Sequence, residues 1–210
     1  MLSSLRAQSI LPILTRIVVI LICFPVHECA HAWTAWKLGD PTGKEMGRIS
    51  LNPLKHLDLW GTITILVLGF GYAKPVPVNI RNFRRQKLGF AVTALAGPLS
   101  NLLMAVVFLV LIRAALLAEI TNRTVYWCLQ YAAYINISLA VFNLIPIPPL
   151  DGSRVVTAIL PDRAYYTMLK YERYSMFVIW GLLVLCSRLG FSPVSRISQS
   201  VYTALARLII

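Results

Sequence analysis

Long apolar segments with almost no charge constrain the fold of this chain more than any other feature. The stretch 89–117 contains a single charged residue, Arg113. A run of about 20 apolar residues is long enough to cross the hydrocarbon core of a bilayer as a helix. Of the 210 residues, 58% are hydrophobic and 13% are charged, about half of the roughly 25% charge that is typical of soluble domains. The sequence therefore predicts an integral membrane protein.

Four segments have the apolar character expected of membrane-spanning helices: 9–36, 89–117, 125–145 and 174–190. The C-terminal residues from 192 onward are instead amphipathic, which is typical of a helix lying at the membrane interface. We expect an all-α polytopic membrane protein, with residues 1–210 forming a single membrane-embedded domain.

The region between the first two spans, residues 47–80, differs from the spans. Its apolar piece, 59–73, is short for a span and rich in glycine and β-branched residues. The alternating sequence that follows contains Pro75 and Pro77, which exclude a helix interior. We therefore expect a re-entrant or strand-like element. Backbone without regular hydrogen bonds is tolerated at membrane depth only against protein or a water-filled cavity. We therefore expect this element to line one or the other.

Basic residues predict the orientation in the membrane. The net charge is +12, and lysines and arginines gather between the first and second spans and between the third and fourth. Cytoplasmic loops carry such an excess, so we expect both groups on the cytoplasmic side and the N-terminus outside. The charge thus has an explanation that needs no nucleic-acid partner. No signal-peptide cleavage site precedes residue 27, and the compact chain fits a prokaryotic plasma membrane.

His27, Glu28 and His31 form an HExxH motif at the end of the first apolar segment. Residues four apart lie on one face of a helix, so both imidazoles can reach one metal ion. Zinc suits imidazole ligands, and with three protein ligands it retains and activates a water molecule. Glu28 is placed to accept the proton and pass it to a leaving amine. An ionisable residue inside a span costs about 3 kcal/mol or more, which favours a functional role.

Three residues are candidates for the third metal ligand. Asp151 ends the apolar, proline-rich stretch "NLIPIPPL". The span before it and the span carrying His31 both run inward, so the two residues should reach a similar depth. His56 and Asp58 remain alternatives, because "NPLKHLD" follows the first span closely.

The HExxH motif in a first span, together with "NLIPIPPLDG" in a later one, resembles the site-2 protease (peptidase M50) family of intramembrane zinc metalloproteases. The likeness is greatest to its small members without a PDZ domain. The stretches "GDPTGKEMGRISLNPLKHLDLWGT", "YAKPVPVN" and "AGPLSN" are similar to segments between the two motifs in that family. The resemblance implies one zinc ion per chain, held by His27, His31 and Asp151, with Glu28 as catalytic base.

Two asparagines and one short segment are candidates for substrate contact. The resemblance implies that Asn143 lies beside the substrate carbonyl, where an amide can stabilise the oxyanion; the alternative is a helix-terminating cap. Asn101, in "GPLSN", is either a second polar group at the site or a hydrogen-bonding residue between helices. An unpaired strand edge can capture an extended peptide. The candidate edge consists of Lys74, Pro75, Val76, Pro77, Val78 and Asn79.

These features predict an intramembrane zinc endopeptidase that hydrolyses a peptide bond in or near a transmembrane segment of a membrane-protein substrate. Two alternatives are a zinc-binding or transport protein of the membrane and a non-catalytic scaffold. Transporters often show paired repeats, which this chain lacks, and a structural zinc usually takes four protein ligands. The sequence does not indicate the substrate, the gating of cleavage, a homo-oligomer or a regulatory partner.

Overall fold

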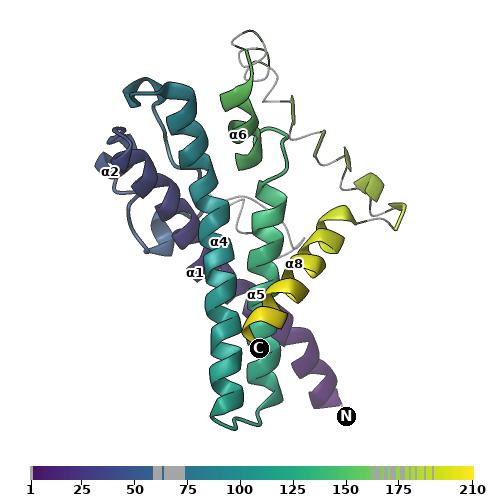
Figure 1. The fold of residues 1–210 in the computed structure, drawn as a ribbon. Coiled ribbons are helices and arrows are strands. Elements are labelled where there is room, and N and C mark those ends of the chain that lie inside the picture. Colours follow the sequence, from purple (N-terminus) through teal and green to yellow (C-terminus); the bar gives the residue numbers. More distant parts are fainter. Residues whose placement is uncertain are drawn as a thin grey trace.

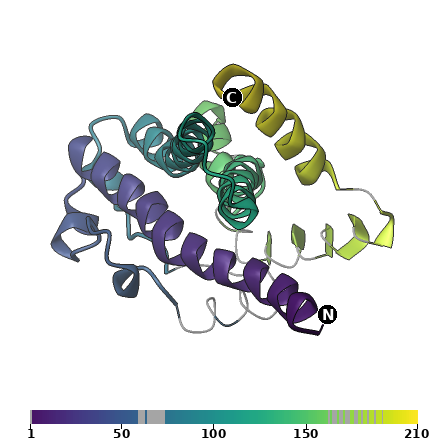
Figure 2. The same cartoon turned by 90° about the horizontal axis from the view of Figure 1, so that it is seen from below.

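The computed structural model describes residues 2–58, 63, 74–161 and 192–210, with scattered positions from 163 to 190. Within these residues the regular secondary structure is entirely helical. Three long helices form a bundle: α1 (Leu2–Lys37), α4 (Gln86–Leu117) and α5 (Arg123–Asn143) (Figure 1). Figure 2 views α4 and α5 nearly along their axes and shows α1 crossing them at a steep angle.

Among the described helices, α4 and α5 are long and apolar enough to cross a membrane. A short loop joins them as an antiparallel pair, and Asn122 caps the start of α5 by accepting a hydrogen bond from the Thr124 N–H at 2.9 Å. The predicted helices over 9–36, 89–117 and 125–145 are confirmed as helices; α4 and α5 agree to within three residues at each end, whereas α1 begins seven residues before the predicted start. Of the fourth predicted span, 174–190, twelve positions are described; ten of these are helical, and residues 189 and 190 form a turn.

Short helical turns occupy the described part of the connection between α1 and α4: α2 (Thr42–Glu45), η1 (Pro53–Lys55) and η2 (Ile80–Asn82). The strand predicted here is not formed in residues 47–58 and 74–80. Prolines in this segment remove backbone donors that a ladder would need. Apart from residue 63, the piece 59–73 lies outside the described residues.

A buried carboxylate anchors the end of this connection to the end of α1. Asp40 accepts hydrogen bonds from the Thr42 hydroxyl at 2.6 Å, the Asn82 side-chain amide at 2.7 Å and the Asn79 N–H at 2.8 Å. Burial alone would raise the pKa of the Asp40 carboxyl, but these hydrogen bonds outweigh it and lower the pKa. Asp40 therefore holds residues 79–82 as a charged acceptor.

A buried arginine anchors the other end of the same connection. The Arg48 guanidinium donates to the carbonyl oxygens of Lys55, Lys74 and Pro75. The Lys74 N–H in turn donates to the His56 carbonyl at 2.8 Å. Residues 74–79 are thus held at both ends by side chains rather than by a neighbouring strand.

The C-terminal helix α8 (Pro193–Ile209) lies obliquely across the bundle (Figure 1). One side of it packs on a buried cluster of α4 and α5 side chains that includes Leu109, Ile112 and Ala133. Tyr202 of α8 meets Tyr134 of α5 with ring centroids 6.3 Å apart. The predicted C-terminal helix is confirmed, and part of its apolar face packs on the bundle, whereas Ile197 and Leu208 are exposed.

Candidate metal centre

Three side chains from two helices converge on one point. His27 and His31 come from α1, and Asp151 is the first residue of α6 (Asp151–Ile159). The Nε2 atoms of the two histidines lie 3.0 Å apart, and each is 3.4 Å from Asp151 Oδ2. Among the described residues, this is the one group of three or more His, Cys, Asp or Glu side chains that could hold a metal ion.

The geometry of this group fits a zinc ion. Tetrahedral ligands about 2.0–2.1 Å from zinc lie roughly 3.3–3.4 Å from one another, and the three observed separations run from 3.0 to 3.4 Å. Asp151 Oδ2 is buried and accepts no hydrogen bond, so its lone pairs are available to a metal. Two imidazoles and one carboxylate leave a fourth position open, as catalytic zinc sites do.

Local helix geometry brings the two histidines together. His27 and His31 are one turn apart on α1, with ring centroids 4.6 Å apart and ring planes nearly perpendicular at 86°. Both side chains are buried, with exposed fractions of 7% and 8%. The pairing therefore follows from the i, i+4 spacing of the motif alone.

A tight turn brings Asp151 back to the histidines. α5 ends at Asn143, and the chain reverses through residues 144–150 before α6 begins. A Cβ atom placed at Gly152 would lie 2.8 Å from the Ile145 carbonyl oxygen and closer still to that of Leu144. Only glycine permits so close an approach of backbone to backbone. The glycine of the "LDG" sequence thus lets the turn fold onto the first turn of α6.

Helix α4 contacts both histidines. The Thr93 carbonyl oxygen lies 2.7 Å from His31 Nδ1, and the Asn101 carboxamide lies 3.1 Å from His27 Nδ1. Between them, a Cβ placed at Gly97 would lie 2.5 Å from His27 Cε1 and closer still to His31 Nε2. The sequence indicated Asn101 as a candidate but not Thr93 or Gly97. Gly97 lies four residues before Asn101 on the same helix face, and this spacing is the signal that would have found it. Thr93 acts through its backbone carbonyl, so its identity gives no such signal.

Glu28 is buried on α1 between the two histidines, with 9% of its surface exposed. Its charge acts on His31 and on two residues of the connection after α1, Arg48 and His56. Burial lowers the pKa of the Arg48 guanidinium, and the negative charge of Glu28 opposes that shift. Glu28 thus interacts electrostatically with both a metal-ligand candidate and a buried cation.

The two alternative third ligands lie outside the metal centre. His56 is fully buried, and its Nε2 lies 2.7 Å from the Ser50 carbonyl oxygen. Burial lowers the pKa of His56. Neither His56 nor Asp58 belongs to the group that could hold a metal. The structure therefore favours Asp151 as the third ligand.

The candidate substrate contacts lie in two other places. Asn143 is the last residue of α5 and is partly exposed, and its side chain makes no hydrogen bond to the described part of the chain. Residues 74–79 run without regular secondary structure. Of the N–H groups that prolines leave in this segment, those of Val76 and Val78 donate to no backbone carbonyl of the described residues.

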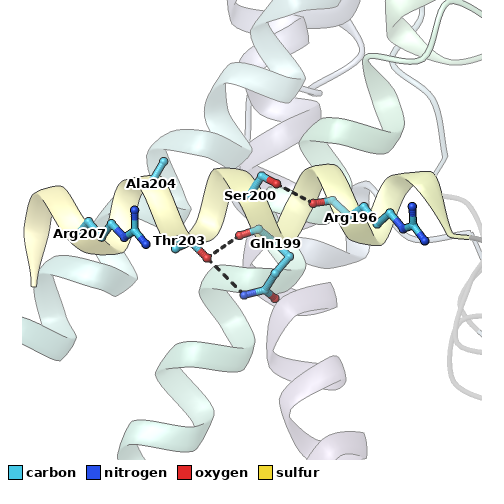
Figure 3. A pocket seen from close by; sticks show the side chains of 6 residues that line it. All are labelled: Arg196, Gln199, Ser200, Thr203, Ala204 and Arg207. Carbon is cyan, nitrogen blue, oxygen red and sulfur yellow. Dashed lines mark hydrogen bonds between the residues drawn. The ribbon is translucent and has the colours of Figure 1, made fainter.

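A separate groove of about 570 Å³ runs along the outward face of α8 (Figure 3). Six residues of this one helix line it: Arg196, Gln199, Ser200, Thr203, Ala204 and Arg207. None of the metal-ligand candidates contributes to it, so the groove is not part of the metal centre.

The known proteins and the family model that match this chain are all of the zinc metalloprotease kind. Residues 111–186 match the model of peptidase family M50. YwhC of Bacillus subtilis (strain 168), named as a candidate zinc metalloprotease, is 40% identical over 183 residues, which are 84% of this chain and 82% of that protein.

Two further relatives carry names of the same kind. MJ0611 of Methanocaldococcus jannaschii is 31% identical over 148 residues, covering 70% of this chain and 72% of that protein. Rip2 of Mycolicibacterium smegmatis is 30% identical over 165 residues, covering 76% and 62%. No solved structure matches the chain.

Proposed function

Since the chain belongs to peptidase family M50 and is a zinc metalloprotease, we propose that it hydrolyses peptide bonds in or near the transmembrane segments of membrane proteins. One observation carries this proposal. The buried group of His27, His31 and Asp151 packs against α4, a helix long and apolar enough to cross a membrane. A protease centre placed there would meet substrates at membrane depth.

His27, His31 and Asp151 would hold one zinc ion per chain through Nε2, Nε2 and Oδ2. When bound, zinc supplies Lewis-acid activation of water and polarises the peptide carbonyl. Glu28 accepts the proton of the attacking water and delivers it to the leaving amine. Its burial beside the histidines supports this role, because a carboxylate shielded from bulk water keeps the proton within the site.

Asn143 and residues 74–79 would receive the substrate. The Asn143 carboxamide is not engaged by the described residues, so it can donate to the carbonyl of the scissile bond. The N–H groups of Val76 and Val78 can pair with an extended peptide, as in β-strand addition. A helical substrate must unwind first, because in a bilayer its backbone hydrogen bonds are satisfied internally.

The proposal extends to the placement of the centre in a multi-pass membrane protein. The metal centre contacts the first half of α4, between Thr93 and Asn101. Basic residues at 84, 85 and 87 surround the start of that helix. By the positive-inside rule, the active site lies toward the cytoplasmic side and the N-terminus lies outside. Bacterial and archaeal relatives support a prokaryotic plasma membrane.

Cleavage of a single-span model substrate by the purified protein tests this function, with wild type beside Glu28→Gln and Asp151→Ala. We expect wild type to cleave and a zinc chelator to abolish cleavage. Glu28→Gln should retain one zinc ion and lose about 100-fold to 10,000-fold in kcat, because the proton acceptor is gone. Asp151→Ala should lose both zinc and activity. Zinc content is measured by elemental analysis of each purified variant.

Other outcomes separate the alternatives. Cleavage by Glu28→Gln at the wild-type rate would refute the proposed base. Full zinc retention by Asp151→Ala would move the third ligand to His56 or Asp58. Zinc bound in wild type without cleavage of any single-span substrate would favour a zinc-binding or transport protein.

A further inference from the structure

The two histidines of the metal centre present the same ring atom, Nδ1, to helix α4. For His31 the partner is the Thr93 carbonyl oxygen at 2.7 Å. A carbonyl oxygen can only accept a hydrogen bond, so the proton of a neutral His31 ring is on Nδ1 and the lone pair is on Nε2. Nε2 is the atom that faces His27 and Asp151. The backbone of α4 therefore sets His31 in the tautomer that a metal requires.

For His27 the corresponding partner is a side chain. The Asn101 carboxamide is fully buried, and its Nδ2 position lies 3.1 Å from His27 Nδ1. A carboxamide has a donor end and an acceptor end, and the hydrogen-bonding network decides which one faces a neighbour. The structure places Nδ2 toward His27 Nδ1 and leaves the buried Oδ1 without a hydrogen-bond partner; exchanging the two ends of the amide would give Oδ1 a donor, provided that His27 Nδ1 carries its proton. The orientation of the Asn101 amide therefore follows from what His27 requires. His27 Nε2 needs its lone pair for the metal, so Nδ1 carries the proton and needs an acceptor.

We propose that Asn101 is a positioning residue for the metal centre. Its side-chain oxygen accepts a hydrogen bond from His27 Nδ1 and so fixes both the tautomer and the ring orientation that aim Nε2 at the metal. This inference rests on the proposed ligand set of His27, His31 and Asp151. It assigns Asn101 a contact with a ligand rather than with the substrate carbonyl.

The chain contains a matched comparison residue. Asn136 on α5 is also fully buried. Its side-chain amide donates to the Ala132 carbonyl oxygen at 2.9 Å and lies 3.1 Å from Cys23 Sγ. It contacts no candidate metal ligand. Replacing Asn136 removes a buried amide of the same size from the same bundle, at a position whose hydrogen bonds involve neither histidine.

The test measures zinc affinity by competition with a chromophoric chelator for wild type, Asn101→Leu, Asn101→Asp, Asn136→Leu and His27→Ala. Asn101→Leu should weaken zinc binding by about 10-fold to 100-fold, the usual effect of losing such a partner. Asn101→Asp should bind zinc far more tightly than Asn101→Leu, because a carboxylate oxygen still accepts from Nδ1. Asn136→Leu should bind zinc like wild type. The spectrum of bound Co²⁺ should change in Asn101→Leu but not in Asn136→Leu.

The same measurements show which idea fails. Wild-type zinc affinity in His27→Ala would overturn the ligand set and the inference with it. Loss of zinc in His27→Ala with wild-type affinity in Asn101→Leu would overturn the inference alone. Equal weakening in Asn101→Asp and Asn101→Leu would show that an acceptor is not what His27 requires. If Asn101→Leu does not fold, the comparison of Asn101→Asp with Asn136→Leu still decides, because the inference requires Asn101→Asp to retain zinc.

Discussion

The two ends of helix α4 carry the same stripe of buried residues but use it differently. In the first half the stripe consists of Thr93, Gly97 and Asn101, which contact the two histidines of α1. In the second half it continues through Ala105 and Leu109, and the latter packs with α5 and α8. The four-residue spacing is constant, as expected for a ridge that packs into the groove of a crossing helix.

The packing of α4 therefore has a different role in each half of the helix. The second half buries apolar side chains and holds the bundle together. In the first half, the stripe consists of the Thr93 carbonyl oxygen, Gly97, which has no side chain, and the Asn101 amide instead of apolar side chains. Each of the three contacts a histidine ring. We infer that the first half positions the metal centre and the second half stabilises the fold. Three substitutions along α4 test this separation.

Gly97→Ala should have the largest effect. In an ordinary helix position this change favours the helix by about 1 kcal/mol. Here the new Cβ would lie 2.5 Å from His27 Cε1, so the rings must move away from the positions that face Asp151. We expect zinc affinity to fall by about 100-fold or more, the upper end of the range for residues that support metal ligands. Chelator competition measures it, and unchanged affinity would show that the rings can shift without loss.

Leu109→Ala should lower the stability of the fold and leave zinc affinity unchanged, the opposite of what we expect for Gly97→Ala. Leu109 is fully buried in the cluster with Ile112 and Ala133. Its truncation should lower the free energy of unfolding by about 2–5 kcal/mol, through lost contacts and the cavity left behind. Denaturation of the detergent-solubilised protein measures this loss, and the zinc affinity of the folded protein should stay at the wild-type value. A parallel fall in zinc affinity would mean that the two halves of α4 do not act separately.

Arg113→Gln should have the smallest effect. The Arg113 guanidinium donates to the carbonyl oxygens of Ile209 and Ile210 at 3.0 and 3.2 Å, but these contacts are exposed. Exposed polar contacts contribute little, so we expect less than about 1 kcal/mol of lost stability. The thermal midpoint measures it against Leu109→Ala. A loss as large as that of Leu109→Ala would show that α8 is held by this polar contact rather than by the apolar cluster.

Much of the helical framework could be predicted because apolar runs and their lengths are local features. The helices over 9–36, 89–117 and 125–145 appear where their composition placed them. Residues 74–79 show the limit of this approach. Their alternating pattern predicted a strand, but a strand needs a partner, and the carbonyls at one end bond to Arg48 instead.

Family membership was also predictable, because two motifs in a set order are rare by chance, and the comparisons confirm it. The side chains that hold the connection after α1, and the contacts of α4 with the metal centre, could not be predicted. Asp40 and Arg48 fall in a polar loop where charged residues are usually exposed, yet both are buried. Thr93 acts through its backbone carbonyl, which any residue would supply, so its identity carries no signal.

The sequence by itself determined the pairing of His27 and His31, because residues four apart on a helix must share a face. It left Asp151, His56 and Asp58 open as third ligands. Only the tertiary structure brings one of them, Asp151, to the two histidines, since its approach depends on a turn that closes over Gly152. The same holds for the contacts of α4, which reach the histidines across 62 and 74 residues of chain. Such contacts depend on how helices cross, and the local spacing of residues does not determine that crossing.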